Sequence, residues 1–199
     1  MIVVDVETTG LRPEKNSIVS IGALDFSNPK NQFYKECRIW EGAEISDQAL
    51  EINGFTKDEI TSFNKPSLEE TIKEFFSWVF KIEDITIAGE NPGFDRDFLN
   101  NSFKRAGLDF YFGHRAVDLH SICYGHHIKY GKAIPLVKNM TGLNLDKTLN
   151  YIGLFSEPKP HNALTGAKME AEAFSRFFFG KVLFEEYSEY FVPYQKLNK

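Results

Sequence analysis

The sequence predicts an α/β or α+β domain built on a mixed sheet. Three apolar stretches of strand length lie near the N-terminus and are separated by turn residues, which predicts an antiparallel meander of three strands. Farther along, a short apolar strand alternates with stretches whose apolar residues recur at helical spacing. This order of elements is typical of a sheet flanked by helices, and residues 1–199 are expected to form one domain.

The expected strands are short and bounded by turn formers. Gly10 and Pro13 mark the first turn, and Asn28-Pro29 marks the second. The strands are expected at residues 2–7, 17–26, 33–40 and 85–88.

Helix starts are indicated by two capping-box sequences, one beginning at Thr56 and one at Ser67. The second precedes an apolar stripe at helical spacing, formed by Leu68, Ile72, Phe75, Phe76 and Val79. Further helices are expected at residues 94–105 and 117–124, from about residue 146, and at residues 162–179.

Composition and charge restrict the function. The net charge of −5 argues against a protein that holds long nucleic acid on a basic surface. An enzyme that grips a few nucleotides in a cleft remains possible, because bound divalent cations can face the phosphates there. The first residues carry two carboxylates and do not resemble a signal peptide, no apolar run is long enough to span a bilayer, and two cysteines are too few for a disulfide framework. A cytoplasmic protein without a membrane partner is expected.

Asp5 and Glu7 are the sharpest local signal. Side chains two apart in a strand project to the same face, so Val4 and Val6 are expected to enter the core while two carboxylates stand together opposite them. Acids are disfavoured in strands, and hard divalent cations such as Mg²⁺ or Mn²⁺ would explain the pair. The alternative is that this face of the strand is simply solvated.

Two other segments carry residues that could take part in catalysis. Asp95 lies where the fourth strand gives way to a helix, and a helix N-terminus would favour a carboxylate there even without a catalytic role. His161 precedes the last expected helix, where a lone histidine is often only a surface residue.

Taken together, the three motifs resemble those of a known family. D-V-E-T-T-G at residues 5–10, N-P-G-F-D-R-D-F-L at residues 91–99 and H-N-A-L-T-G-A at residues 161–167 resemble, in order and spacing, the motifs of the DEDDh 3′–5′ exonucleases, which include the proofreading subunit of bacterial DNA polymerase III. The resemblance implies a ribonuclease-H-like fold. It covers residues 1–179, so residues 180–199 form a C-terminal extension of a single exonuclease-like domain.

The resemblance also implies roles for particular residues. Asp5, Glu7 and Asp95 would hold two Mg²⁺ or Mn²⁺ ions and His161 would act as general base. The substrate-binding positions that it indicates near the terminal nucleotide are Thr8, Gly10, Asn53, Asn91 and Phe94.

One expected metal ligand is missing. The family carries an aspartate five residues after the histidine, and Gly166 stands there instead. Glu170 is one helical turn farther on, and helical side chains lean toward the N-terminus, so its carboxylate could reach back to the site. Glu170 could equally be an exposed acid paired with Lys168 or lying near Arg176, whereas Glu172 would point away.

A zinc site is the rival metal interpretation. Histidines and a cysteine gather within fourteen residues, although their spacing matches no common structural zinc pattern: His114, His120, Cys123, His126 and His127.

The favoured function is a 3′–5′ exonuclease, with DNA preferred, that removes nucleoside monophosphates from single-stranded or frayed 3′ ends. One of its two metals would be weakly held because of Gly166. The alternative is a catalytically impaired family member that binds nucleic-acid ends or a DNA polymerase. A hydrolase of RNA ends or small oligoribonucleotides on the same fold is a third possibility.

Overall fold

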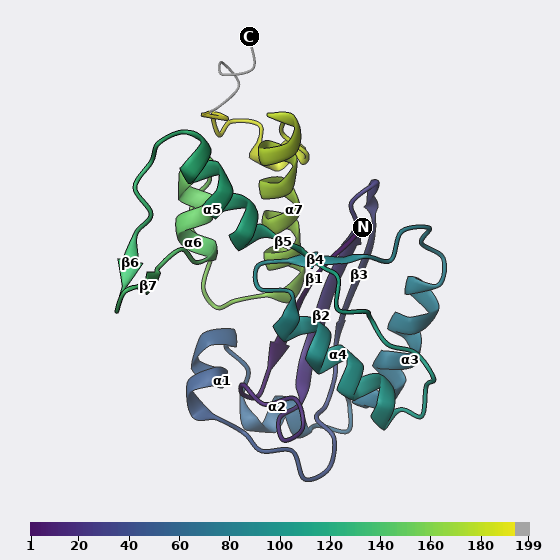
Figure 1. Ribbon diagram of the computed structural model, residues 1–199. Helices are drawn as coiled ribbons and strands as arrows, with labels where there is room; N and C mark the ends of the chain where they lie inside the picture. The colour runs from purple at the N-terminus through teal and green to yellow at the C-terminus, as the bar shows by residue number, and fades with distance from the viewer. Residues whose placement is uncertain (194–199) are drawn as a thin grey trace.

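The computed structural model describes residues 1–193 and contains a mixed five-stranded sheet in the order β3-β2-β1-β4-β5 (Figure 1). β1 pairs with β2, and β2 with β3, in antiparallel fashion, whereas β4 is parallel to both β1 and β5. The prediction of a mixed sheet with three antiparallel N-terminal strands is confirmed. The strands are β1 Ile2–Thr8, β2 Ile18–Asp25, β3 Asn28–Glu36, β4 Ile87–Gly89 and β5 Val117–Asp118.

Helices cover both faces of the sheet. α3 and α4 lie on one face, and α7 lies on the other with α5 and α6 packed against it (Figure 1). The helices are α1 Asp47–Asn53, α2 Lys57–Thr61, α3 Leu68–Val79, α4 Gly93–Arg105, α5 Leu119–Lys129, α6 Leu145–Tyr151 and α7 Ala163–Phe179. Smaller elements are the hairpin of β6 Leu136–Val137 and β7 Met140–Thr141 and the 3₁₀ turn η1 Glu185–Tyr187. In residues 1–193 no helix has the length and apolar character that crossing a bilayer requires.

Alternation along β1 divides the molecule into two cores. Val4 and Val6 pack with α3 and α4, whereas Val3 packs with α7 on the opposite face. Asp5 and Glu7 share the face of Val3, and α7 covers that face, so Glu7 is only 8% exposed. The suggestion that this face of the strand is solvated is therefore wrong.

Glycines let α7 lie close to the sheet. A Cβ atom at Gly22 in β2 would lie closer than 3.0 Å to the backbone of Ala163, the first residue of α7. A Cβ at Gly89 in β4 would lie 3.0 Å from Oε2 of Glu170 and 3.2 Å from the carbonyl oxygen of Val4. The first turns of α7 therefore reach the two strands that flank β1, which carries Asp5 and Glu7.

The third strand begins earlier than predicted. The chain turns at Phe26 and Ser27, where Oδ1 of Asp25 accepts hydrogen bonds from the backbone N–H and the hydroxyl of Ser27, at 2.9 and 2.6 Å. Asn28-Pro29 is therefore the start of β3 and not the turn, and the strand ends at Glu36 and not at residue 40. A proline is tolerated there because β3 is an edge strand.

The helix predicted at residues 117–124 begins and ends later in the structure. Asp118 caps α5 by accepting from the backbone N–H groups of His120 and Ser121, and Val117 and Asp118 themselves pair with β4. Apolar periodicity alone does not show that β5 comes first. The β6–β7 hairpin was not predicted.

The chain after α7 packs back onto that helix. A buried ion pair joins Arg176 to Glu172, which points away from the site as predicted. The Arg176 guanidinium donates to the carbonyl oxygens of Tyr187 and Phe191, so the described part of the C-terminal extension is held against α7. The rest of the predicted extension, residues 194–199, lies outside the described residues.

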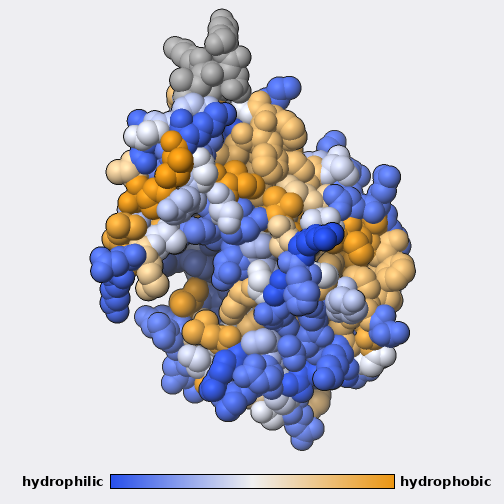
Figure 2. Space-filling model, viewed as in Figure 1, coloured by the Kyte–Doolittle hydropathy of each residue, from blue (hydrophilic) through white to orange (hydrophobic). Residues whose placement is uncertain are grey.

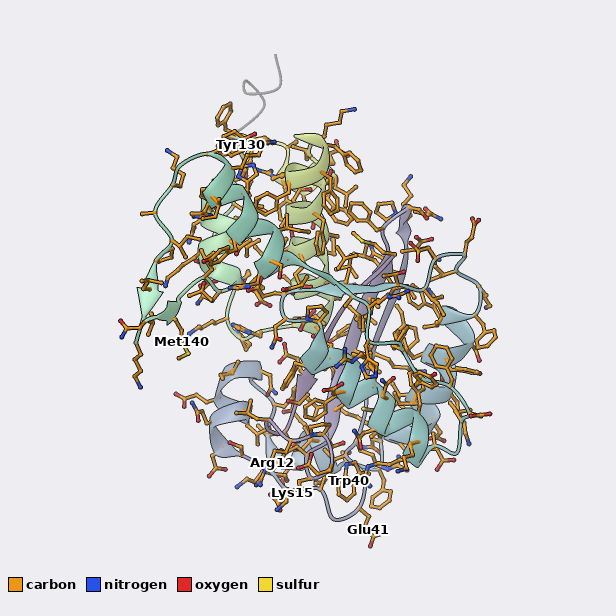
Figure 3. The ribbon with its side chains drawn as sticks, in the orientation of Figure 1. Arg12, Lys15, Trp40, Glu41, Tyr130 and Met140 are labelled. Carbon is orange, nitrogen blue, oxygen red and sulfur yellow. The ribbon has the colours of Figure 1, made fainter. Side chains whose placement is uncertain are left out.

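Polar and apolar surfaces are unevenly distributed. Hydrophilic residues dominate the end of the molecule near α1 and α2, and apolar residues gather toward α7 (Figure 2). Figure 3 places Arg12 and Lys15 at the hydrophilic end. Both residues pair with Glu44, at 3.5 and 3.1 Å.

Candidate active site

Carboxylates from four separate segments surround the end of β1. Two come from the strand itself, one from the first turn of α4, one from α7 and one from the loop between α6 and α7. They form one cluster, because the negative charges of these carboxylates raise one another's pKa values. The five residues are Asp5, Glu7, Asp95, Glu157 and Glu170.

Asp95 is tied to the sheet. β4 pairs with β1 only at Ile2 and Val3, so the backbone N–H of Val6 lies beyond the end of β4. Oδ1 of Asp95 accepts a hydrogen bond from that N–H at 3.0 Å. The helix cap is Pro92, so Asp95 does not serve as the N-cap, and this hydrogen bond fixes its buried side chain beside β1.

Glu170 points into the cluster. Its side chain is buried, and Oε1 accepts from the backbone N–H of Glu90 at 3.0 Å. Oε2 is buried without a hydrogen-bond partner in the described structure. The alternative of an exposed acid paired with Lys168 is wrong, because Lys168 pairs with Glu186 instead.

The cluster is electrostatically unfavourable without a cation. Burial raises the pKa of Asp5 to about 7. Burial, with the charges of Asp5, Glu157 and Asp95, raises the pKa of Glu7 to about 9. Burial and the charge of Asp5 hold the pKa values of Asp95 and Glu170 well above their ordinary range. Such a set of oxygen donors suits hard divalent cations, which favour the ionised carboxylates.

The space beside Gly166 is already filled. A Cβ atom at this position would lie closer than 3.0 Å to Oδ2 of Asp5 and 3.2 Å from Oε1 of Glu157. The helical backbone at Gly166 would itself accept a side chain. An added side chain nevertheless requires Asp5 to move.

Glu157 is the acidic residue of the cluster that the sequence analysis missed. Its side chain is only 6% exposed, and its Oε2 lies 3.5 Å from Nδ1 of His161. Ligand atoms of Glu7, Glu157 and His161 all lie within 4.8 Å of one another. The available signal was its position four residues before the predicted base, in a loop with two prolines.

His161 is held against α1. Its backbone N–H donates to the carbonyl oxygen of Ile52 at 3.1 Å, and Pro160 packs over Gly54 at the end of α1. Burial lowers the pKa of the His161 imidazole, and this favours its neutral, proton-accepting form. His161 is thus a partly buried residue beside the acids and not a simple surface histidine.

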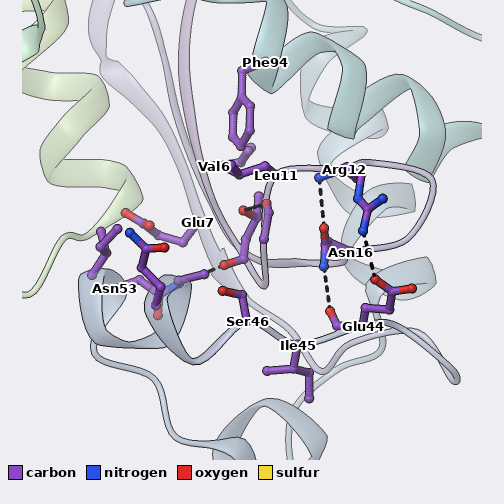
Figure 4. Close-up of a pocket in the computed structure, with 15 residues that line it drawn as sticks. Val6, Glu7, Leu11, Arg12, Asn16, Glu44, Ile45, Ser46, Asn53 and Phe94 are labelled. Carbon is purple, nitrogen blue, oxygen red and sulfur yellow. Dashed lines mark hydrogen bonds and ion pairs between the residues drawn. The ribbon is translucent and has the colours of Figure 1, made fainter.

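A pocket of about 470 Å³ adjoins the carboxylates (Figure 4). Thr8, Gly10, Asn53 and Phe94 line it, as do Glu7 and several residues that were not predicted: Leu11, Arg12, Asn16, Ser46, Ala49 and Ile52. Asn91 is not among the lining residues. It is exposed, with a φ of 53°, and its N–H donates to Asp118.

Asn16 and Asn53 shape the pocket wall (Figure 4). The Asn16 side chain accepts from the backbone N–H of Arg12 at 2.9 Å and donates to the carbonyl oxygen of Glu44 at 2.9 Å. A Cβ at Gly10 would lie 2.6 Å from the Asn16 side chain, which explains the glycine. Asn53 donates to the carbonyl oxygen of Thr8 at 3.0 Å, so α1 supports the end of β1.

The histidines near α5 have other partners. His120 contacts the hydroxyl of Thr141 at 3.1 Å, and His127 contacts the carbonyl oxygen of Cys123 at 2.9 Å. Within residues 1–193, the potential ligand atoms that converge belong to Glu7, Glu157 and His161, and none of the predicted zinc residues joins them. Cys123 Sγ does lie 3.6 Å from His127 Nδ1, but within the described residues no third ligand atom joins them, so the zinc interpretation is not supported.

A mixed sheet with buried acids at the end of its central strand defines a nuclease of the ribonuclease-H-like class. The RNase_T exonuclease family model matches residues 2–174, and the chain belongs to this exonuclease family. The predicted fold and the predicted membership of the DEDDh exonucleases are confirmed.

Relatives show the breadth of the family. The chain is 31% identical over 180 residues to the PolC-type DNA polymerase III of Thermotoga maritima, covering 88% of this chain and 12% of that protein. It thus spans about an eighth of the length of that relative. Among solved structures, Escherichia coli exonuclease I with a dT13 oligonucleotide has a TM-score of 0.70 at 18% identity and covers 88% of this chain and 40% of the other. The nuclease domain of 3′hExo, a DEDDh family member bound to rAMP, has a TM-score of 0.67 at 18% identity. The match covers 91% of this chain and 92% of that domain.

Proposed function

We propose that this protein is a 3′–5′ exonuclease that removes nucleoside monophosphates from single-stranded or frayed 3′ ends, with DNA preferred over RNA. The observation that carries the proposal is the convergence of Asp5, Glu7 and Asp95 beside a pocket of about 470 Å³. A pocket of this size lies within the range of small-ligand sites and suits a terminal nucleotide. We further propose that residues 1–199 form one exonuclease domain with a C-terminal extension at residues 180–199.

Asp5, Glu7 and Asp95 would hold divalent cations, and the buried, unpartnered Oε2 of Glu170 is a further oxygen donor for them. Magnesium and manganese fit because all of these donors are carboxylates. Such cations supply water activation and neutralise charge on the scissile phosphate and the leaving oxygen. His161, held neutral by its partly buried position, would accept the proton of the attacking water.

The pocket wall would orient the terminal nucleotide. Leu11, Ile52 and Phe94 present apolar surface on which the terminal base and sugar can pack. Thr8 and Asn53 line the same pocket near Glu7, where polar groups can meet the sugar of the last nucleotide. Because the protein has a net charge of −5, we propose that the cations supply much of the attraction for phosphate.

The biological setting is part of the proposal. The match to a polymerase of which this chain covers only 12% supports a DNA polymerase as a partner, and the oligonucleotide complex of exonuclease I supports single-stranded DNA as substrate. The cysteines Cys37 and Cys123 are free and buried, which fits the reducing cytoplasm that we propose as the location.

The test is cleavage of 5′-labelled single strands of DNA and RNA by the purified protein in Mg²⁺, Mn²⁺ or EDTA. We expect stepwise shortening from the 3′ end that requires a cation and is lost in Asp5→Asn. Cation-dependent binding of labelled strands without cleavage would overturn the proposal in favour of the catalytically impaired family member. Faster cleavage of RNA would favour the RNA-end hydrolase.

A further inference from the structure

Because Gly166 replaces the aspartate of the family motif, another residue could supply the missing carboxylate. A Cβ atom at Gly166 would lie 3.2 Å from Oε1 of Glu157. The carboxylate of Glu157 therefore lies beside the place where a side chain at position 166 would begin, next to the Asp5 carboxylate, which is closer still. It reaches that place from the loop before α7 and not from the helix.

The loop holds Glu157 by its backbone. The N–H of Glu157 donates to Oδ1 of Asp146, in the first turn of α6, at 3.1 Å. Four residues later, the N–H of His161 donates to Ile52 of α1. Because the loop backbone is fixed at both points, the side chain of Glu157 is held at the site, where its Oε2 lies 3.5 Å from Nδ1 of His161.

The Glu157 side chain itself indicates a ligand. It is 6% exposed, and its Oε1 is buried without a hydrogen-bond partner in the described structure. Burying a carboxylate oxygen without a hydrogen-bond partner costs free energy, so the burial of this oxygen needs an explanation. A divalent cation provides one, because a ligand atom of Glu157 lies within 4.8 Å of one from Glu7.

We propose that Glu157 supplies the metal-binding carboxylate that position 166 lacks, and that it binds a divalent cation together with Asp5 and Glu7. This inference rests on the proposed function and specifies the ligands of its metal site. Glu170 is placed differently: one of its oxygens is committed to the backbone of Glu90, and the other lies against Gly89 of β4. Glu157 is the carboxylate on the side of Glu7 and His161.

The test is calorimetric titration of the EDTA-stripped full chain with Mn²⁺. Glu157→Gln should weaken the tightest Mn²⁺ affinity at least about tenfold, by analogy with the 10- to 100-fold effects of residues that support metal sites. The control Glu69→Gln removes an exposed carboxylate on α3 and should leave the affinity unchanged. An affinity within twofold of wild type for Glu157→Gln would overturn the inference.

A second variant tests whether the two positions serve the same place. In Glu157→Gln/Gly166→Asp, a carboxylate returns from the helix once the Asp5 side chain shifts away from the new Cβ, and Mn²⁺ affinity should recover part of what Glu157→Gln lost. Metal-free thermal melts report whether each variant folds; if the double variant does not, the single-variant titration decides. Failure of a folded double variant to recover would overturn the shared position.

The outcomes separate this inference from the function on which it rests. If Asp5→Asn abolished Mn²⁺ binding and Glu157→Gln left it unchanged, the proposed function would stand and the role of Glu157 would fall. A wild-type protein that bound no Mn²⁺ would overturn both.

Discussion

Replacing Asp5 with asparagine should stabilise the metal-free protein while destroying its activity. Asp5 lies among buried acids, and burial raises its pKa from 3.8 to about 7. A pKa shift of one unit corresponds to about 1.4 kcal/mol, so keeping Asp5 ionised in the folded protein costs at most about 4 kcal/mol. Because neighbouring acids can take up the proton instead, we expect a gain of about 1–3 kcal/mol for Asp5→Asn.

The sign depends on pH. The folded-state pKa of Asp5 lies above its unfolded value, so the folded protein binds the extra proton between the two. The cost is therefore absent below about pH 4, grows as the pH rises and is complete above about pH 7. In a domain of this size, 1 kcal/mol corresponds to about 2–4 °C in Tm, so Asp5→Asn should melt about 2–12 °C higher at pH 8 in EDTA.

Thermal melts in EDTA at pH 4 and pH 8 provide the assay, with the exposed Asp109→Asn as matched control. The control should match wild type at both pH values, and Mn²⁺ should stabilise wild type more than Asp5→Asn. A Tm at pH 8 equal to or below that of wild type, or an equal gain at pH 4, would refute the reasoning.

Three further changes test the base, the sheet and the C-terminal segment. His161→Ala should lower turnover by roughly 10²–10⁴-fold and remove the ascending limb of the pH–rate profile, with calorimetric Mn²⁺ affinity little changed; normal turnover would exclude His161 as the base. Gly22→Ala should cost about 1–3 kcal/mol in denaturant unfolding because its Cβ meets the backbone of Ala163, whereas Gly125→Ala, with open space around it, should gain about 0.5–1 kcal/mol; equal effects would contradict the close packing of α7. Arg176→Ala leaves Glu172 buried without its partner and should cost about 3–5 kcal/mol, with faster limited proteolysis after residue 180; unchanged cleavage would mean that Arg176 does not hold that segment.

Local rules predicted where several of the acidic side chains lie. The alternation of β1 placed Asp5 and Glu7 on one face, and helical spacing placed Glu170 within reach of them. Both inferences use geometry within a single element. Neither could show that α7 buries this face, because that depends on Gly22 and Gly89 in other strands.

Contacts between segments far apart in the sequence determine which other side chains reach the site. Glu157 reaches the site because its loop is anchored to Asp146 and to α1, contacts that no local pattern encodes. Asn91 belongs to a matching motif but does not line the pocket, and its backbone N–H donates to Asp118, whose carboxylate also caps α5. A motif thus predicts that a segment reaches the site, while its neighbours determine which side chains face the pocket.

The glycine at position 166 does not leave the site short of carboxylates. Four acids are expected in this family, and five surround the end of β1 here, three of which also occupy family positions. An aspartate at position 166 would compete with Asp5 for space and would bring a sixth negative charge. Glycine at position 166 therefore leaves room for the carboxylates already present. Glu157 reaches the cluster from the loop before α7, and Glu170 reaches it from the next turn of that helix. If Glu157 and Glu170 bind the cations as proposed, the departure from the family motif changes where the acidic ligands originate, and by itself it is no argument for lost catalysis.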